Sequence, residues 1–490
     1  MKKQESKHTI DNMLSYMITY SQDRNEVRVL ELDKEIVKSR QSIISQLTQA
    51  RLEKGLSQEQ LAELIGTKRS NICRIESGTQ NLSLDMLIKI SKALGKNVSI
   101  LLEERSVPMN VYSLRLYDDE LITFSLEEKG LEGLQASILN VNTDMNDLFP
   151  LDLELTESGI LKWLERRVIP KNRQFVDEIL KTLGLSVNNT KGIIDVCKGL
   201  SLNDSYWVVP ADFNGKYEDY NLYENRFSEA LSLVAYTGAG ASEQAFSTSP
   251  ELTTNGMLRK AWRYIEDNGI YLYKGGTQGA ANAGNEPYSE YYACQIADKM
   301  GLNCVSYDLE NWKGILASKC KLFTDINTSY IPIVRIVKSG SIKACIDYHD
   351  KLGNEFSEQI RSMLVFDAVI YNEDRHFGNF GILRDNHTGN IIAPAPIFDN
   401  GISLFNYAMN DDIKDLSRYA KTRSNPYGVT FESICSEVMG AKQKAQLRRL
   451  IGFKFKRHPS INLPEERLIT IENHINDRVK ELLAIPPIKR

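Results

Sequence analysis

YNEDRHFGNFGIL, residues 371–383, contains Asp374, His376 and Asn379 in a D-x-H-x-x-N arrangement, and the interpretation of this 490-residue chain depends on it. Asp399 follows twenty residues after Asn379, in the segment PIFDNGIS. Phosphoryl transfer needs one carboxylate for the attacking hydroxyl, and an Asn and a second Asp that hold Mg²⁺ against the phosphates. Asp374, Asn379 and Asp399 fit these roles in that order. We expect His376 to brace the loop by hydrogen bonds.

This motif alone leaves the chemistry open. The same D-x-H-x-x-N spacing occurs in small-molecule kinases of the aminoglycoside type. His376 and Asp399 could instead form a surface pair, or bind a metal ion for hydrolysis. Segments earlier in the chain must therefore decide between phosphotransfer and these alternatives.

A candidate phosphate-binding lysine lies about a hundred residues earlier. GIYLYKGGT, residues 269–277, predicts a strand with Lys274 near its end, where the ammonium group can reach ATP phosphates. A solvated lysine is the alternative. The helix predicted over 286–302 offers Glu290 as a partner for Lys274, and Glu286, nearer the helix start, is the less favoured partner.

A glycine-containing segment, AYTGAGASEQAFSTSP, precedes this strand at residues 235–250. Gly238 and Gly240 would let the backbone approach phosphates. A lone G-x-G is a weak signal, and a surface loop is the alternative. The segment gains weight because it stands in front of the Lys274 strand, where a kinase phosphate loop belongs.

The N-terminal part of the chain predicts a helix-turn-helix. Ser57 and Gln60 form a capping box, Gly66 ends the helix that follows, and Gly78 ends the next one. Two short helices joined by a tight turn suit a recognition helix in the major groove, although a helical bundle used only for protein contacts has the same pattern. The residues expected to contact DNA are Gln58, Lys68, Arg69, Asn71 and Arg74.

The bulk composition indicates a soluble, cytoplasmic protein. The net charge is -4, so any DNA contact must come from a local patch. Seven dispersed cysteines, none at C-x-x-C spacing, predict reduced thiols instead of a disulfide framework or a zinc site. The N-terminus lacks the apolar stretch of a signal peptide, and no segment is apolar enough to cross a membrane.

Two families resemble parts of this sequence. The stretch SQEQLAELIGTKRSNICRIESGTQNLSLDMLIKISKALG resembles Xre/Cro-type helix-turn-helix domains, whose recognition positions fall on the four residues from Lys68 to Arg74 named above. SEYYACQIADKMGLN, DRHFGN and PIFDNGIS resemble HipA-like serine/threonine kinases over roughly residues 230–485. This second resemblance implies that Asp374 is the catalytic aspartate, that Asn379 and Asp399 bind the metal, and that Lys274 contacts phosphates. It also places KLFT, residues 321–324, near the adenine-binding hinge.

The glycine segment departs from the S-x-x-G-A-Q-type loop of the HipA-like family. The resemblance therefore does not carry over that family's autophosphorylation. A hydroxyl of residues 237–249 could still accept phosphate beside the two glycines, although ordinary turn residues are the favoured interpretation. The candidates are Thr237, Ser242, Ser247, Thr248 and Ser249.

The expected fold is multidomain. An all-α helix-turn-helix domain precedes an α+β, protein-kinase-like (HipA-like) two-lobed domain with a largely helical C-lobe. The expected boundaries are 1–35 for an N-terminal extension, 36–104 for the helix-turn-helix domain, 111–325 for the N-lobe with its extension, and 326–490 for the C-lobe.

The leading functional hypothesis is a DNA-binding kinase that uses ATP and Mg²⁺ to phosphorylate a protein Ser or Thr hydroxyl. It would act as a homodimer on its own operator in double-stranded DNA, and a fused toxin–antitoxin-like unit is one form of this hypothesis. The first alternative is a repressor whose kinase-like domain senses nucleotide without catalysis. The second is a small-molecule phosphotransferase with a DNA-binding arm.

Overall fold

The computed structural model describes residues 43–78, 80, 82–98, 110–130, 133–239, 248–266 and 268–488. The chain divides into two compact units, residues 1–106 and 107–490. The expected extension over 1–35 lies outside the described residues. Within the described ranges, every helix is too short or too polar to span a bilayer.

Unit 1 is a small helical domain built on capped helices. Ser57 Oγ accepts a hydrogen bond from Gln60 N at 3.1 Å, and Gln60 Oε1 accepts one from Ser57 N at 2.8 Å, which confirms the predicted capping box. Gly66 ends the first capped helix at φ +70°. The helices pack around an apolar core that includes Leu61, Ile72 and Ile90. They comprise residues 43–53, α2 (Gln58–Ile65), α3 (Arg69–Glu76) and α4 (Leu84–Ala93).

Unit 2 begins with an antiparallel sheet in the order β3-β2-β1-β4. In its strand over residues 111–116, every second side chain points to the same face of the sheet. Tyr112, Leu114 and Leu116 lie on that face, in the core that the helices cover. The strands are β1 (Val111–Leu116), β2 (Asp119–Glu128), β3 (Leu134–Val141) and β4 (Tyr206–Pro210); the helices are α5 (Glu157–Glu165), α6 (Val176–Lys181) and α7 (Thr190–Cys197).

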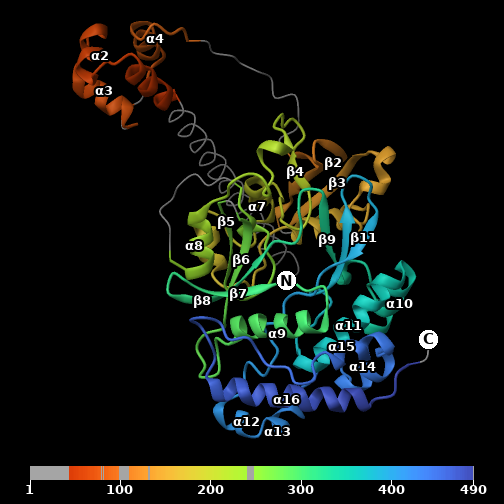
Figure 1. The fold of residues 1–490 in the computed structure, drawn as a ribbon. Coiled ribbons are helices and arrows are strands. Elements are labelled where there is room, and N and C mark those ends of the chain that lie inside the picture. Colours follow the sequence, from red (N-terminus) through yellow and green to blue (C-terminus); the bar gives the residue numbers. More distant parts are fainter. Residues whose placement is uncertain are drawn as a thin grey trace, which may run out of the picture. The chain divides into compact units, whose positions relative to one another are not determined.

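A second antiparallel sheet, in the order β5-β6-β8-β7, carries the Lys274 strand. Helix α8 contacts β5, and helix α9 contacts β6, β7 and β8. Figure 1 shows the sheets on one side of α9 and the C-terminal helices on its other side. The elements are α8 (Glu229–Thr237), β5 (Lys260–Ile265), β6 (Gly269–Gly275), α9 (Glu286–Met300), β7 (Tyr307–Trp312) and β8 (Ile315–Lys321).

A buried ion pair joins the first part of unit 2 to the start of the second sheet. Arg173 and Glu251 have fully buried side chains and bind each other. Arg173 also donates to Glu251 O at 2.7 Å and to Lys260 O at 3.0 Å. The guanidinium group therefore fixes the backbone of residues 251–260 immediately before and at the start of β5.

The rest of unit 2 is mostly helical, as predicted. Residues 372–403, for which the sequence shows no regular pattern, nevertheless contain two strands. They contain a hairpin that pairs with β9, in the order β11-β10-β9. Its strands are too short, and interrupted by a bulge at Leu383/Arg384, to give a clear alternating pattern. The elements are β9 (Thr328–Pro332), α10 (Ile342–Leu352), α11 (Asn354–Ile370), β10 (Gly381–Asp385), β11 (Ile391–Pro394), α12 (Asn410–Lys414), α13 (Leu416–Ala420), α14 (Phe431–Val438), α15 (Ala441–Arg448) and α16 (Glu465–Ala484).

The largest core lies in this helical part. Helix α11 is buried over most of its length, and α16 buries an apolar stripe that includes Leu468, Ile475 and Leu482. Residues 371–383 follow α11 directly. The D-x-H-x-x-N loop is therefore anchored at its start by a buried helix and at its end by β10.

Candidate functional site

A cavity of about 760 Å³ lies within unit 2. Its lining includes residues of α5, β5, β6 and β9, the segments after β8, β9 and β11, and the loop before β10. It brings together four predicted site residues that are far apart in the sequence: Lys274, His376, Asn379 and Asp399. All four KLFT residues, 321–324, which are expected near a nucleotide hinge, line the same cavity.

Lys274 occupies the centre of an ion-pair network. Its Nζ lies 2.6 Å from Glu290 Oε1, so the pair predicted between strand and helix is present. The same Nζ binds Asp399. Glu290 Oε2 accepts a hydrogen bond from Asn400 N at 2.7 Å. Glu290 therefore connects the lysine with the backbone of the Asp399 segment.

Glu286 has a different partner. Its carboxylate accepts hydrogen bonds from Thr277 Oγ1 at 2.7 Å and Thr277 N at 3.2 Å. It is buried, and it holds the turn after β6 against the start of α9. The sequence-based preference for Glu290 over Glu286 agrees with these contacts.

Charge, and not only burial, sets the protonation of this network. Burial by itself would raise the pKa of Asp399, but Lys274 and then Lys260 outweigh burial and hold that pKa well below its usual range. Burial opposes the charge of Lys274, yet Asp399 and Glu290 raise the pKa of Lys274 above its ordinary value. Lys274 and Asp399 are consequently both charged at neutral pH.

Asp374 lies beside this network without lining the cavity. Its backbone oxygen accepts a hydrogen bond from Asn379 Nδ2 at 3.1 Å. Burial raises the pKa of Asp374, His376 lowers it, and the negative charge of Asp399 raises it further. His376 Nδ1 accepts a hydrogen bond from Gly378 N at 3.0 Å, which is the loop-bracing contact expected of it.

Arg375 is a functional-site residue that the sequence analysis missed. Its fully buried guanidinium group binds the Asp367 carboxylate at 3.0 Å and Asn400 Oδ1 at 2.5 Å. It also donates to the carbonyl oxygens of Asn379 and Phe398. One side chain thus ties α11, the D-x-H-x-x-N loop and the Asp399 segment together. The available signal was Asp367, the single charged residue in the apolar run 363–370 of α11.

Lys260 is the second missed residue. It faces Lys274 across β5 and β6 and lines the cavity. Its Nζ donates to Asn255 O at 2.8 Å, and no carboxylate pairs with it among the described residues. Burial first, and the charge of Lys274 second, lower the pKa of Lys260 to about 7. The cavity therefore holds a buried amine that an anionic ligand would stabilise in its charged form.

The glycines that line the cavity are not those predicted. Gly238 ends α8 at φ +73°, and a Cβ there would meet the Phe175 ring at 2.5 Å. Gly238 does not line the cavity. Helix termination and the contact with Phe175 account for its conformation. Gly240 lies outside the described residues. Gly256, at φ +94°, lines the cavity next to Lys260, in a segment that lacks a G-x-G pattern.

The hydroxyls considered for phosphorylation have structural partners where they are described. Thr237 Oγ1 donates to Leu233 O at 2.8 Å within α8. Ser249 is buried, and its Oγ accepts a hydrogen bond from Glu251 N at 3.3 Å. Thr248 is half-buried, while Ser242 and Ser247 lie outside the described residues. These contacts favour the interpretation as ordinary turn residues.

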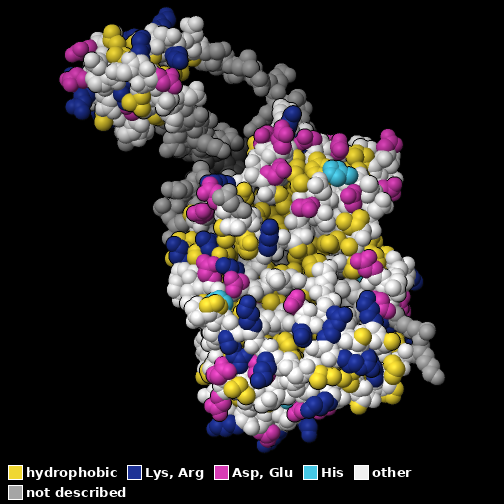
Figure 2. All heavy atoms as spheres, viewed as in Figure 1, with side chains coloured by type: hydrophobic (Ala, Val, Ile, Leu, Met, Phe, Trp, Pro, Cys, Tyr) yellow, Lys and Arg dark blue, Asp and Glu magenta, His cyan; other side chains and the backbone are white. Residues whose placement is uncertain are grey.

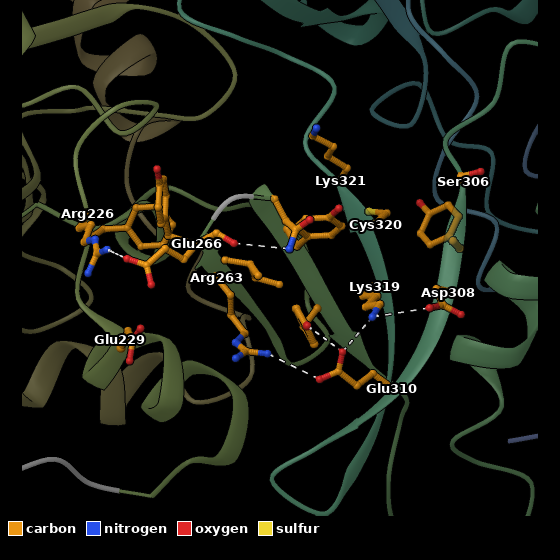
Figure 3. Close-up of a pocket in the computed structure, with 17 residues that line it drawn as sticks. Arg226, Glu229, Arg263, Glu266, Ser306, Asp308, Glu310, Lys319, Cys320 and Lys321 are labelled. Carbon is orange, nitrogen blue, oxygen red and sulfur yellow. Dashed lines mark hydrogen bonds and ion pairs between the residues drawn. The ribbon is translucent and has the colours of Figure 1, made fainter. Parts of the chain in front are cut away.

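A larger hollow of about 1260 Å³ lies over the same sheet but is lined mainly by alternate residues, which point to the sheet's other face. Figure 3 shows that its charged side chains face one another. Lys319 lies 3.0 Å from Glu310, Arg263 lies 3.8 Å from Glu310, and Arg226 binds Glu266. These charges largely neutralise each other, so this hollow lacks the uncompensated amine of the smaller cavity.

No group of three or more His, Cys, Asp or Glu side chains suited to a metal ion occurs among the described residues. Mg²⁺ does not need such a group, because it binds one or two protein oxygens, water and substrate phosphates. Asn379 and Asp399 line the cavity together and supply oxygen donors of the kind that Mg²⁺ prefers.

The recognition surface expected in unit 1 lies on and before α3. Lys68, Arg69 and Arg74 are exposed. Asn71 is half-buried, donates to Thr67 Oγ1 at 3.0 Å and accepts from Arg74 Nη2 at 3.0 Å. Side chains of both charge signs lie on the visible face of this unit (Figure 2), so this face is not a strongly basic surface.

Gln58 is engaged within the domain. Its Nε2 donates to Glu76 Oε2 at 2.8 Å. Glu76 also pairs with the buried Arg51 at 2.6 Å. Gln58, which is expected to contact DNA, therefore also helps to fix α2 against α3.

The sequence comparisons agree with two separate modules. Residues 47–101 match the Helix-turn-helix family model. Over 61 residues the chain is 43% identical to an uncharacterised HTH-type transcriptional regulator of Haemophilus influenzae, covering 12% of this chain and 62% of that protein. Over 143 residues it is 30% identical to the serine/threonine-protein kinase CtkA of Helicobacter pylori, covering 26% and 43% respectively. The chain thus spans less than two thirds of the length of either relative.

Solved structures of the same kinds are also similar. The proinflammatory kinase CtkA of Helicobacter pylori has a TM-score of 0.39 at 17% identity, covering 47% of this chain and 91% of that one. The HipA, HipB and operator DNA complex of the Shewanella oneidensis toxin–antitoxin system has a TM-score of 0.47 at 13% identity, covering 76% and 100%. The predicted resemblance to helix-turn-helix proteins is confirmed by the family model, and the partial similarity to CtkA agrees with the predicted resemblance to a serine/threonine kinase. The arguments about the site rest on its own contacts.

We predict that Arg375→Met lowers the free energy of unfolding of unit 2 by about 3–5 kcal/mol, because it leaves the buried Asp367 carboxylate without its partner. Urea unfolding followed by tryptophan fluorescence measures this, since Trp163, Trp207, Trp262 and Trp312 all lie in unit 2.

Arg423→Met is the matched control, because Arg423 and Glu373 form a half-exposed pair at 3.1 Å. It should cost under about 1 kcal/mol. Adding Asp367→Asn to Arg375→Met should recover part of the loss. Equal stability of the Arg375 and Arg423 variants would contradict the proposed anchoring role.

Proposed function

We propose that this chain is a DNA-binding, HipA-like kinase that uses ATP and Mg²⁺ to phosphorylate a Ser or Thr hydroxyl of a protein. The observation that carries the proposal is the Lys274–Glu290 ion pair, which is bound through Asn400 N to the Asp399 segment. Kinases require a lysine–glutamate pair and a metal-binding aspartate in one site. The similarity to CtkA over 143 residues supports the same chemistry.

The cavity residues fit a nucleotide. Lys274 and Lys260 would bind phosphate oxygens, and Leu322, Phe323 and Thr324 would lie along the base and sugar. Asn379 and Asp399 would hold Mg²⁺, which when bound neutralises charge on the phosphates. Lys274 now neutralises Asp399, and a bound cation would take over that task and leave the lysine for the nucleotide.

Asp374 would accept the proton of the acceptor hydroxyl. Its raised pKa brings it closer to neutral pH than an ordinary aspartate, which improves a general base. Arg375 would hold the loop so that Asp374 and the metal ligands keep a fixed separation. His376 would act by bracing the loop through Gly378.

The helix-turn-helix unit would bind double-stranded DNA at the chain's own operator, as a homodimer on two half-sites. With a kinase on the same chain, this gives a toxin–antitoxin-like unit that controls its own synthesis. Both tasks place the protein in the cytoplasm. If ATP binds and no phosphate is transferred, the chain is instead a repressor that senses nucleotide.

Asp374→Asn should reduce phosphotransfer by about 100-fold or more while ATP affinity stays nearly constant, because general-base catalysis contributes about 10²–10⁴-fold. Asp399→Asn should weaken Mg²⁺ and ATP binding together. Calorimetry with ATP and Mg²⁺, and turnover with labelled ATP, separate the two effects. Asp411→Asn, on an exposed side chain of α12, is the control. Full phosphotransfer by Asp374→Asn would refute this mechanism.

ATP binding should take up protons at about pH 8, because Lys260 has a pKa of about 7 in the free protein and the phosphates would restore its charge. ATP affinity should accordingly fall as pH rises above about 7, where the protonated fraction of Lys260 declines. Calorimetry in buffers of different ionisation enthalpy measures the uptake.

Lys260→Met should abolish the proton uptake and lower the affinity at neutral pH. Lys321→Met changes an exposed lysine of the same cavity and should leave the uptake intact. Identical proton uptake in the wild type and Lys260→Met would assign the titration to another group.

Arg69→Ala and Arg74→Ala should each weaken operator binding by about 1–3 kcal/mol and reduce its salt dependence if the contact is to phosphate. Gel shifts with the DNA upstream of the protein's own coding sequence test this. Lys92→Ala, an exposed position of α4, is the control. Unchanged affinity in both arginine variants would remove α3 as the recognition helix.

A further inference from the structure

The cavity carries more positive charge than a nucleotide requires. Among the described residues, seven lysine and arginine side chains line it against two carboxylates, Glu154 and Asp399. Lys260 and Lys274 lie beside the metal-binding segment. Four further cations form what we call the basic rim: Lys162, Arg166, Arg335 and Lys338.

The basic rim has two walls from distant parts of the sequence. Lys162 lies on α5 and Arg166 follows that helix, whereas Arg335 and Lys338 follow β9. Asp152 joins the walls, because it lies 3.1 Å from Arg166 and 3.3 Å from Arg335. The rim is therefore a built feature of unit 2 and not a chance run of surface lysines.

The wall after β9 is attached to the candidate catalytic loop. Ile333 N donates to Phe380 O at 2.9 Å, and Val334 N donates to Phe377 O at 2.9 Å. Arg335 comes next in the chain. A molecule bound on the basic rim would consequently lie next to residues 374–380, where the acceptor hydroxyl must be delivered.

Part of the rim charge is available for exchange. Lys338 pairs with Glu154, but their side chains are 67% and 53% exposed, and such pairs contribute little. Lys162 is exposed. An incoming carboxylate could replace Glu154 at small cost, whereas the less exposed Asp152 would keep holding Arg335.

We propose that the basic rim binds acidic residues flanking the acceptor hydroxyl, so that the substrate is a Ser or Thr in an acidic protein segment. This rests on the proposed kinase function and names its substrate class. Separate side-chain carboxylates suit cations on two walls with Asp152 and Glu154 between them. A continuous phosphate backbone would meet repulsion from those two acids.

The test uses the full chain with ADP, Mg²⁺ and a fluorescent peptide that has one central serine flanked by glutamates. A second peptide carries glutamines in their place. Anisotropy should show tighter binding of the acidic peptide, which weakens with salt. Lys162→Glu with Lys338→Glu should reduce that binding by about tenfold or more. Lys414→Glu with Lys480→Glu, two exposed lysines paired elsewhere, makes the same charge change and should have no effect.

Phosphotransfer assays add a second readout. The acidic peptide should have the higher kcat/KM, and the rim variant should lose this preference with an unchanged KM for ATP. Anisotropy measures peptide binding without turnover. Absence of phosphotransfer would therefore count against the proposed function, while the anisotropy experiment would still test peptide binding to the basic rim. Equal affinity for both peptides would overturn the inference. So would a rim variant that loses only ATP binding, or a single-stranded RNA that displaces the peptide.

Discussion

Everything that the candidate site can do depends on one buried ammonium group between two carboxylates. Lys274 binds Glu290 from α9 and Asp399 from the segment after β11. Without the lysine, the buried Glu290 carboxylate and the partly exposed Asp399 carboxylate would repel each other, and the second sheet would lose a polar link to the helical part of unit 2. On the proposed function, a cation that neutralised Asp399 would free Lys274 for a nucleotide, so cation binding and phosphate binding should be coupled.

The sequence predicted which side chains meet in this site better than it predicted the strands around them. Residue types at fixed spacing, such as Asp374 and Asn379, were visible because the six residues 374–379 lie on one loop and must share a local geometry. The Lys274–Glu290 pair was predictable because a strand end followed by a helix start brings two such residues together. The helix-turn-helix was predictable because capping residues and glycines mark short helices directly. The hairpin β10–β11 was missed because its strands are too short to establish a period.

Contacts between distant segments were beyond this kind of prediction. Arg375 joins Asp367, Asn379 and Asn400, and Arg173 joins residues 251–260 to a segment nearly eighty positions earlier. A buried arginine has the same appearance in a sequence as an exposed one. Its role follows only from which carbonyl and carboxylate oxygens surround it, because burying a guanidinium group requires partners for nearly all of its donors.

Two residues that were candidates for ligand contacts have structural roles in the fold. Gly238 ends a helix, and Gln58 binds Glu76. The DNA contact of Gln58 stays a prediction. Lys260 is the opposite case, since the fold buries its amine next to another lysine and supplies no carboxylate for it among the described residues. A fold that leaves a buried charge uncompensated carries a cost in stability, and a bound anion removes that cost. For the proposed nucleotide site, the Lys260 amine is a better guide to a phosphate position than a glycine pattern, because it lines the cavity and no carboxylate pairs with it among the described residues.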